Sequence, residues 1–304
     1  MSQKISLQAL NRVLSSLDAA RNGPALYALL STFSVAGLLL AMAESALARS
    51  DTSWGVVWAG LALTVAFYGV NTTGLLLMDQ ALGRPVRDVQ DALRDALLVA
   101  HRVLLSLAVV LGLLGLVLTA LLGLLWAARL PWLGAPLFAL TVPLGVLLLG
   151  LSSFAVLVLV GPLTGPSVWA GQTVRPTLRL FARQLRGGLL DAAVLMAAVL
   201  LLTAVVSAAV SFVVISGARA MSLLAIWGAD ISLPPQQLMA GLFGYGLRSL
   251  GAAGAPVAGS PQGMAALVGG GVVFALALVL PALIYLRGCC AVYLALREVP
   301  DEGL

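Results

Sequence analysis

The sequence predicts an all-α polytopic membrane protein with six transmembrane helices arranged as three hairpins, each preceded by an amphipathic cytoplasmic helix. Hydrophobic residues make up 61% of the 304 residues and charged residues only 10%, whereas soluble domains carry about 25% charged residues. The mean hydropathy is +1.06. This composition excludes a water-soluble or disordered chain, and we expect no nucleic-acid partner despite the net charge of +5. Residues 1–304 are expected to form a single integral membrane domain.

Six uncharged stretches are long enough to cross a bilayer, whose hydrocarbon core of about 30 Å needs about 20 residues of helix. Helices are the only plausible spans, because lipid cannot satisfy an open strand edge and the period-2 alternation of a membrane barrel is absent. We expect Pro162 to end the fourth span. The stretches are 25–43, 55–78, 103–128, 136–160, 192–217 and 263–286.

The basic residues are distributed unevenly about these spans. Thirteen lie at one set of span ends and four at the other, and positive charge accumulates on the cytoplasmic side. We therefore expect a multi-pass protein of a bacterial-type inner (plasma) membrane with both termini in the cytoplasm. The thirteen are Lys4, Arg12, Arg21, Arg84, Arg87, Arg94, Arg102, Arg175, Arg179, Arg183, Arg186, Arg287 and Arg297, and the four are Arg49, Arg129, Arg219 and Arg248. Five tryptophans lie near the expected outer ends: Trp54, Trp58, Trp126, Trp132 and Trp227.

An internal repeat is suggested by two similar segments. Thr73-Gly74 is followed after nine residues by Arg84-Pro85, and Thr164-Gly165 is followed after nine residues by Arg175-Pro176. The offset of 91 residues predicts repeat units 1–83, 84–174 and 175–304. Each unit would place an amphipathic cytoplasmic helix before a transmembrane hairpin.

The three amphipathic segments have predicted apolar faces at helical spacing. They consist of Leu7, Leu10, Leu14 and Leu17 in the first segment, of Val86, Val89, Leu93, Leu97 and Ala100 in the second, and of Leu178, Phe181, Ala182 and Leu185 in the third.

The third segment also carries a basic stripe, formed by Arg175, Arg179, Arg183 and Arg186. One interpretation is contact with the anionic phosphates of the cytoplasmic leaflet. A second is intramolecular pairing with Asp88, Asp91 and Asp95 of the preceding segment, which would form a cytoplasmic collar. A third is binding to an acidic surface of a partner protein. The sequence alone leaves all three open.

Polar residues within the spans are few and uncharged. Buried acids and bases mark proton and ion pathways. The acids nearest to the spans are Glu44 and Asp191, and we interpret both as end caps. Hydroxyl and amide side chains in spans mediate helix packing or line a pore. The candidates for such a polar lining are Asn71, Ser152, Thr203, Ser207 and Ser211.

Catalytic and cofactor signatures are absent. The only lysine is Lys4 and the only histidine is His101. These counts exclude a phosphate-binding loop, which needs its own lysine, and a metal site built from several histidines. We therefore expect no catalytic residue, no metal and no cofactor. The adjacent Cys289 and Cys290 read as packing residues.

The connection after the fifth span, residues 218–262, is the longest expected outer loop. Loops of this length in compact proteins tend to be functional or mobile. It is interpreted either as a lid or partner-docking element or as a connector lying on the lipid surface.

Amphipathic segments such as 83–98, followed by long Leu/Ala spans and a final span ending at 285–297, resemble a group of multi-span bacterial membrane proteins. This group includes the membrane regions attached to some glycerophosphodiester phosphodiesterases. The resemblance implies a helical membrane fold. It rests on no catalytic motif, so it implies no activity and no catalytic residue.

These observations predict a non-enzymatic inner-membrane subunit that acts as a scaffold or assembly factor, with protein partners in a membrane complex. The alternative is a permease-type component that moves a small or lipid-like substrate. A permease would have a cavity lined by Asn71, Ser152 or Ser207, whereas an enzyme would bring His101, Asp191 or Glu44 together in a pocket.

Overall fold

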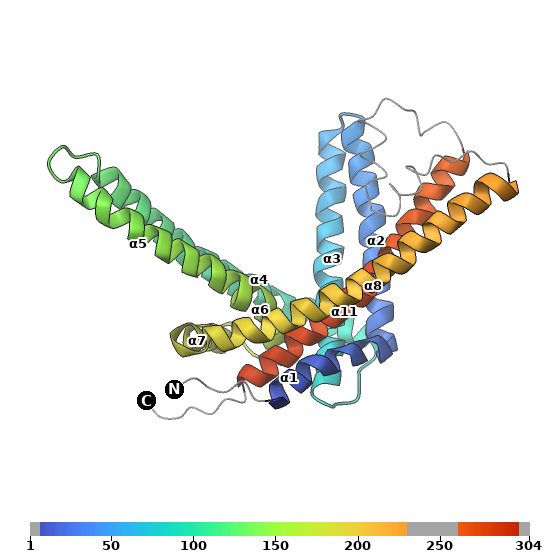
Figure 1. Cartoon of the computed structure of the whole chain (residues 1–304), viewed down its shortest axis with the longest axis horizontal. Helices are drawn as coiled ribbons and strands as arrows, with labels where there is room; N and C mark the ends of the chain where they lie inside the picture. The colour runs from blue at the N-terminus through green and yellow to red at the C-terminus, as the bar shows by residue number, and fades with distance from the viewer. Residues whose placement is uncertain (1–6, 230–260, 298–304) are drawn as a thin grey trace. The chain divides into compact units, whose positions relative to one another are not determined.

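The computed structural model describes residues 7–229 and 261–297, and every regular element in these two ranges is a helix (Figure 1). Six helical stretches there are long and apolar enough to cross a membrane, which confirms the expected all-helical class with six membrane-length helices. They are formed by α2 (Gly23–Ala48), α3 (Thr52–Ala81), α4 (Val89–Ala127), α5 (Gly134–Ala155) with its extension to Trp169, α8 (Leu189–Ala229) and α11 (Pro261–Arg297).

The chain divides into two compact units. One comprises Met1–Val13, Asp95–Ala198 and Gly288–Leu304, and the other comprises Leu14–Arg94 and Val199–Arg287. We describe each unit by itself and call the second one the α2–α3 unit.

Asn22 ties the start of α2 to the end of α3. Its side-chain oxygen accepts from the Ala25 N–H at 3.1 Å, which caps α2. Its amide nitrogen donates to the Leu76 carbonyl at 3.3 Å and to the Gln80 side chain at 3.2 Å. Because Asn22 opens α2 and Gln80 stands near the end of α3, the two helices run antiparallel (Figure 1).

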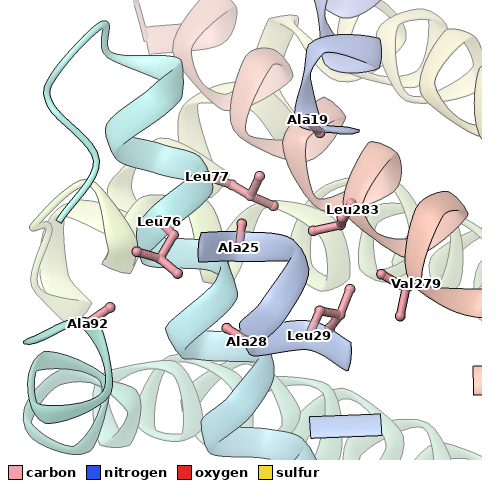
Figure 2. Packing of buried hydrophobic residues seen from close by; sticks show 9 residues of the cluster. All are labelled: Ala19, Ala25, Ala28, Leu29, Leu76, Leu77, Ala92, Val279 and Leu283. Carbon is pink, nitrogen blue, oxygen red and sulfur yellow. The ribbon is translucent and has the colours of Figure 1, made fainter. Parts of the chain in front are cut away.

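The core of the α2–α3 unit combines alanine with leucine. Figure 2 shows Leu29 of α2 close to Leu283 of α11, with the alanines of α2 between them and α3. Alanine brings helix backbones close together, and the buried leucines add van der Waals contacts between the helices. The nine residues of this cluster are Ala19, Ala25, Ala28, Leu29, Leu76, Leu77, Ala92, Val279 and Leu283.

Farther along the pair, Gly69 of α3 packs directly on Thr32 of α2. A Cβ atom added at Gly69 would stand 2.0 Å from the Thr32 hydroxyl oxygen. That hydroxyl donates to the Ala28 carbonyl of its own helix at 2.7 Å, so it cannot rotate away without losing a hydrogen bond. Gly69 therefore leaves the space that the Thr32 side chain occupies between α2 and α3.

We expect Gly69→Ala to destabilise the protein by about 1–3 kcal/mol, because the added methyl group must separate α2 from α3. Gly60→Ala in the same helix is the matched control, since a Cβ atom there meets nothing within 4 Å. Thermal unfolding in detergent checks both variants. Equal melting temperatures for the two would contradict the close approach at Gly69.

A capped turn follows α3. The Arg84 N–H donates to the Asp79 carbonyl at 2.9 Å and the Gly83 N–H donates to the Gln80 carbonyl at 3.2 Å, the pair of bonds that defines a Schellman motif. Gly83 takes the left-handed conformation that this motif needs, with φ of +66°. The turn brings Arg87 back to the Asp79 side chain, with contacts of 2.6 and 2.8 Å.

This ion pair is partly buried, with side-chain exposures of 30% for Arg87 and 6% for Asp79. We expect Asp79→Asn to cost about 1–3 kcal/mol, because it removes the charge that Arg87 faces in a desolvated setting. Asp88→Asn, at an exposed position in the same turn, should change stability by no more than about 0.5 kcal/mol. Detergent unfolding curves measure the difference, and equal losses would show that the pair is not stabilising.

The same turn geometry closes the other unit's helix α6 (Gly161–Trp169). There the Gly171 N–H donates to the Val168 carbonyl and the Gln172 N–H donates to the Ser167 carbonyl, with φ of +87° at Gly171. The two motif glycines are separated by 88 positions, whereas the matched sequence pairs are separated by 91. The matched residues therefore do not occupy equivalent places relative to the helix ends, and the repeat units remain a prediction.

The expected end of the fourth span at Pro162 is wrong. Helix α5 continues through a π-helical turn, Val156–Val160, into α6. The Gly161 N–H donates to the Val156 carbonyl five residues back, and one wide turn of this kind adapts the backbone just before a proline that cannot donate.

Among the described residues of the predicted apolar faces in the first two amphipathic segments, Ala100 is buried and the leucines are exposed. In the first, Leu10, Leu14 and Leu17 are 40–51% exposed, and Val13, Ser16 and Ala19 are buried instead. In the second, Leu93 and Leu97 are 44% and 54% exposed, and Ala92, Ala96 and Ala100 are fully buried. Small side chains permit close helix contact, which leaves the leucines on the lipid-accessible side.

Two boundaries also differ from expectation. The second amphipathic segment is not a separate helix, because α4 runs without interruption from Val89 through the span to Ala127. Residues 218–229 of the expected outer loop belong to α8. Residues 230–260 of that loop lie outside the described residues.

Candidate functional site

A pocket of about 300 Å³ opens beside the turn between α6 and α7 (Val174–Gly187). All of its walls come from the unit that contains Asp95–Ala198 and Gly288–Leu304. It is lined by Ser167, Gln172, Pro176, Thr177, Arg179, Leu180, Arg183, Tyr293 and Arg297. We call it the α6–α7 pocket.

Local sequence explains how the chain builds the pocket wall. Gly171 ends α6 in the left-handed conformation, and Thr173 is extended, with φ of −89° and ψ of 171°. Helix α7 then starts at Val174, so Pro176 lies in its first turn, where a missing N–H leaves no helical hydrogen bond unmade. The turn thereby reverses the chain and sets the beginning of α7 against the end of α6.

Two buried hydroxyl groups hold this arrangement together. Ser167 and Thr177 are 0% and 1% exposed, and their oxygens are 3.0 Å apart. Ser167 also lies 2.9 Å from the Thr164 carbonyl, and Thr177 lies 3.0 Å from the Thr173 carbonyl. Each hydroxyl has one proton, so the pair is occupied within the protein and serves to join α6 to α7.

The predicted basic stripe divides into two pairs. Arg175, Arg179, Arg183 and Arg186 are all exposed on α7. Arg179 and Arg183 line the α6–α7 pocket, while Arg175 and Arg186 are not among its lining residues. The buried side of the helix consists of Thr177, Phe181 and Gln184, so of the predicted apolar face only Phe181 is fully packed, and Leu185 is 48% exposed.

Arg183 is anchored to another helix. Its Nη2 atom donates to the Leu296 carbonyl at 3.2 Å, and Leu296 lies in the last turn of α11. Carbonyls in a last turn lack helical partners and carry the negative end of the helix dipole. Arg183 therefore caps α11 and joins it to α7.

The α11 side of the pocket was not predicted from the sequence. Arg297 had been interpreted only as an indicator of orientation, and Tyr293 had no role. Both lie four residues apart on α11 and line the pocket. The i, i+4 spacing of a tyrosine and an arginine at a helix end is a signal, but their proximity to α7 depends on tertiary structure.

The three acidic residues of the expected collar differ in exposure. Asp88 and Asp91 are exposed, and Asp95 is half-buried. Asp88 and Asp91 belong to the α2–α3 unit, whereas the basic stripe belongs to the other unit. Pairing of these acids with the arginines stays a prediction.

The polar residues of the spans do not line the α6–α7 pocket. Asn71 is 3% exposed and donates to the Phe67 carbonyl at 2.8 Å, and Thr203 donates to the Val199 carbonyl at 2.8 Å. Ser152 and Ser207 are half-buried and Ser211 is exposed. The bonds of Asn71 and Thr203 to their own helices are what a packing role requires, but the choice between packing and pore lining stays open.

The remaining candidates are dispersed. His101 is exposed and Asp191 is half-buried, and the side chain of Glu44 lies outside the described part of the structure. Cys289 and Cys290 are buried thiols outside any disulfide, as a packing role requires. Among residues 7–229 and 261–297, no three His, Cys, Asp or Glu side chains are grouped to hold a metal ion.

Comparison with known proteins returned no matching family model, no matching curated protein and no matching solved structure. The interpretation of the α6–α7 pocket therefore rests on the chemistry of its residues.

We expect Arg183→Gln to loosen the end of α11, because the substitution removes the charged donor to the Leu296 carbonyl. A charge-assisted hydrogen bond contributes about 1.5–3 kcal/mol, so amide hydrogen exchange in the last turn of α11 should accelerate about tenfold or more. Arg186→Gln, on the same helix but outside the pocket lining, is the control. Unchanged exchange in the Arg183 variant would contradict the capping role.

Proposed function

We propose that the protein is a non-enzymatic subunit of a bacterial-type inner membrane that acts as a scaffold or assembly factor for a membrane complex. The observation that carries this proposal is the small extent to which two membrane-length helices are covered by the other residues that the structure describes. In the most apolar stretches of α4 and α8, only 11% and 6% of the residues are buried, against 50% in α3.

Such exposed helices need another covering. Lipid covers apolar side chains without specificity, whereas helix–helix association in a membrane depends on small residues that permit close packing. On α8, Ala197, Ala204 and Ala208 are exposed and lie along one side of the helix. This side is the part of α8 best suited to a helix of a partner protein.

The proposed orientation places both termini in the cytoplasm. The thirteen basic residues at one set of helix ends support it through the positive-inside rule. Trp126, Trp132 and Trp227 near the opposite ends are 73–93% exposed, as aromatic side chains at a membrane interface would be. In this orientation the basic stripe of α7 faces the anionic cytoplasmic leaflet.

The transport alternative has less support. It requires a cavity lined by Asn71, Ser152 or Ser207, and the α6–α7 pocket contains none of them. A scaffold requires only uncovered helix surface, which α4 and α8 provide.

A site-specific photo-crosslinking experiment on the full chain in native membranes tests the scaffold function. We expect crosslinkers placed at Ala197, Ala204 and Ala208 to give discrete protein adducts, because these positions face the proposed partner. A crosslinker at Val213, which is exposed on the opposite side of α8, reports the rest of the α8 surface, and Val199, which is fully buried, is the matched control within the chain.

A pattern restricted to the alanine side supports a specific partner, and co-expression of two differently tagged copies shows whether that partner is the same protein. Lipid adducts alone at every position, from a protein that purifies as a monomer in mild detergent, would contradict the scaffold function.

A further inference from the structure

We propose that the α6–α7 pocket binds a phosphate group through Arg179, Arg183 and Arg297. This inference is independent of the scaffold function, since it concerns a ligand and not a helix surface. The pocket lies within one compact unit, so its walls are positioned relative to one another by the contacts described above.

The charge of the pocket indicates an anion. Among the lining residues that the structure describes, three are arginines and none is acidic. Arginine carries its charge at physiological pH, and three like charges around one small space repel each other unless a counter-charge enters. An anion between them relieves this repulsion and is attracted by all three.

The three arginines of the pocket come from two helices. Arg179 and Arg183 are neighbours at i, i+4 on α7, a spacing that places Cβ atoms about 5–6 Å apart, and Arg297 enters from α11. Arg183 is already held by the Leu296 carbonyl at 3.2 Å. Fixing one arginine in advance lowers the ordering cost that binding would otherwise carry.

The beginning of α7 adds further attraction. Gln172, Pro176 and Thr177 line the pocket, so the ligand would lie close to the positive end of a helix of 14 residues. Thr173, the N-cap residue, makes no capping bond with its side chain. This attraction comes from the helix dipole alone, because the N–H groups of Gln172 and Thr177 donate to the Ser167 and Thr173 carbonyls and Pro176 has no N–H.

Phosphate fits this set of groups better than a carboxylate does. Arginine guanidinium groups match phosphate oxygens in pairs, and three cations suit a ligand with up to two negative charges. A volume of about 300 Å³ is at the small end for ligand pockets, which suits a phosphate with a short substituent. The phosphate belongs either to a lipid headgroup or to a soluble phosphate compound.

The experiment uses the full chain in two arms. In the first, inorganic phosphate is titrated against the protein in an uncharged detergent at constant ionic strength, with chloride as the reference anion. In the second, the protein is placed in nanodiscs of phosphatidylcholine with phosphatidylglycerol, and retained phosphatidylglycerol is counted by native mass spectrometry after detergent release.

We expect Arg179→Gln and Arg297→Gln each to weaken binding about tenfold, since each removes one charge-assisted contact. Arg175→Gln and Arg186→Gln keep the same net charge as those variants but lie outside the pocket lining, so they should weaken binding less than about twofold. Arg179→Lys keeps the charge and loses the paired donors, so its affinity should lie between those of Arg179→Gln and the unaltered chain.

If the pocket variants bind more weakly only in the first arm, the ligand is a soluble phosphate compound. If they bind more weakly only in the second arm, the ligand is a lipid headgroup. Equal loss in all four glutamine variants would reduce the site to a basic surface and overturn the proposal, as would the absence of binding by the unaltered chain in both arms. Melting temperatures without phosphate show whether each variant is folded. If Arg297→Gln does not fold, Arg179→Gln and Arg179→Lys carry the test.

Discussion

Close contact between helix backbones is the constraint on which the described structure depends. Lipid offers no hydrophobic gain for bringing two apolar helices together, so association relies on packing and a few polar bonds. Gly69 against Thr32 provides such packing, and Asn22 provides the polar bonds to Leu76 and Gln80. At the beginning of α4 the alanines Ala92, Ala96 and Ala100 are buried, whereas Leu93 and Leu97 are left to the surroundings.

This constraint also separates what could be predicted from what could not. Six membrane-length helices follow from length and hydropathy alone, because the thickness of the hydrocarbon layer fixes the length of an apolar run. The packed faces do not follow from hydropathy. Leu93 and Leu97 are the more hydrophobic choice for a buried face, yet Ala92 and Ala96 take that place, because in a membrane small size counts for more than hydrophobicity.

The candidate site, too, could be predicted from the sequence only in part. Arg179 and Arg183 could be selected from the sequence because they repeat at helical spacing without an acid between them. Nothing in the spacing separates them from Arg175 and Arg186. That distinction depends on the hydroxyl contact between Ser167 and Thr177 and on the approach of α11, which brings a residue more than a hundred positions away, Leu296, to Arg183.

The π-helical turn at Val156–Val160 has a consequence for the phase of the helix. It inserts one residue beyond the α-helical repeat, so a helical wheel drawn across residues 134–169 is rotated by about 100° on its far side. Side chains before and after the turn that a regular helical wheel would place on one face therefore point in different directions in the protein. Removing one residue from this turn would restore a regular helix and preserve the span, but it would rotate α6 and its joined α7 together relative to the first part of the span. The orientation of the pocket wall thus depends on a single extra residue located in the adjoining span.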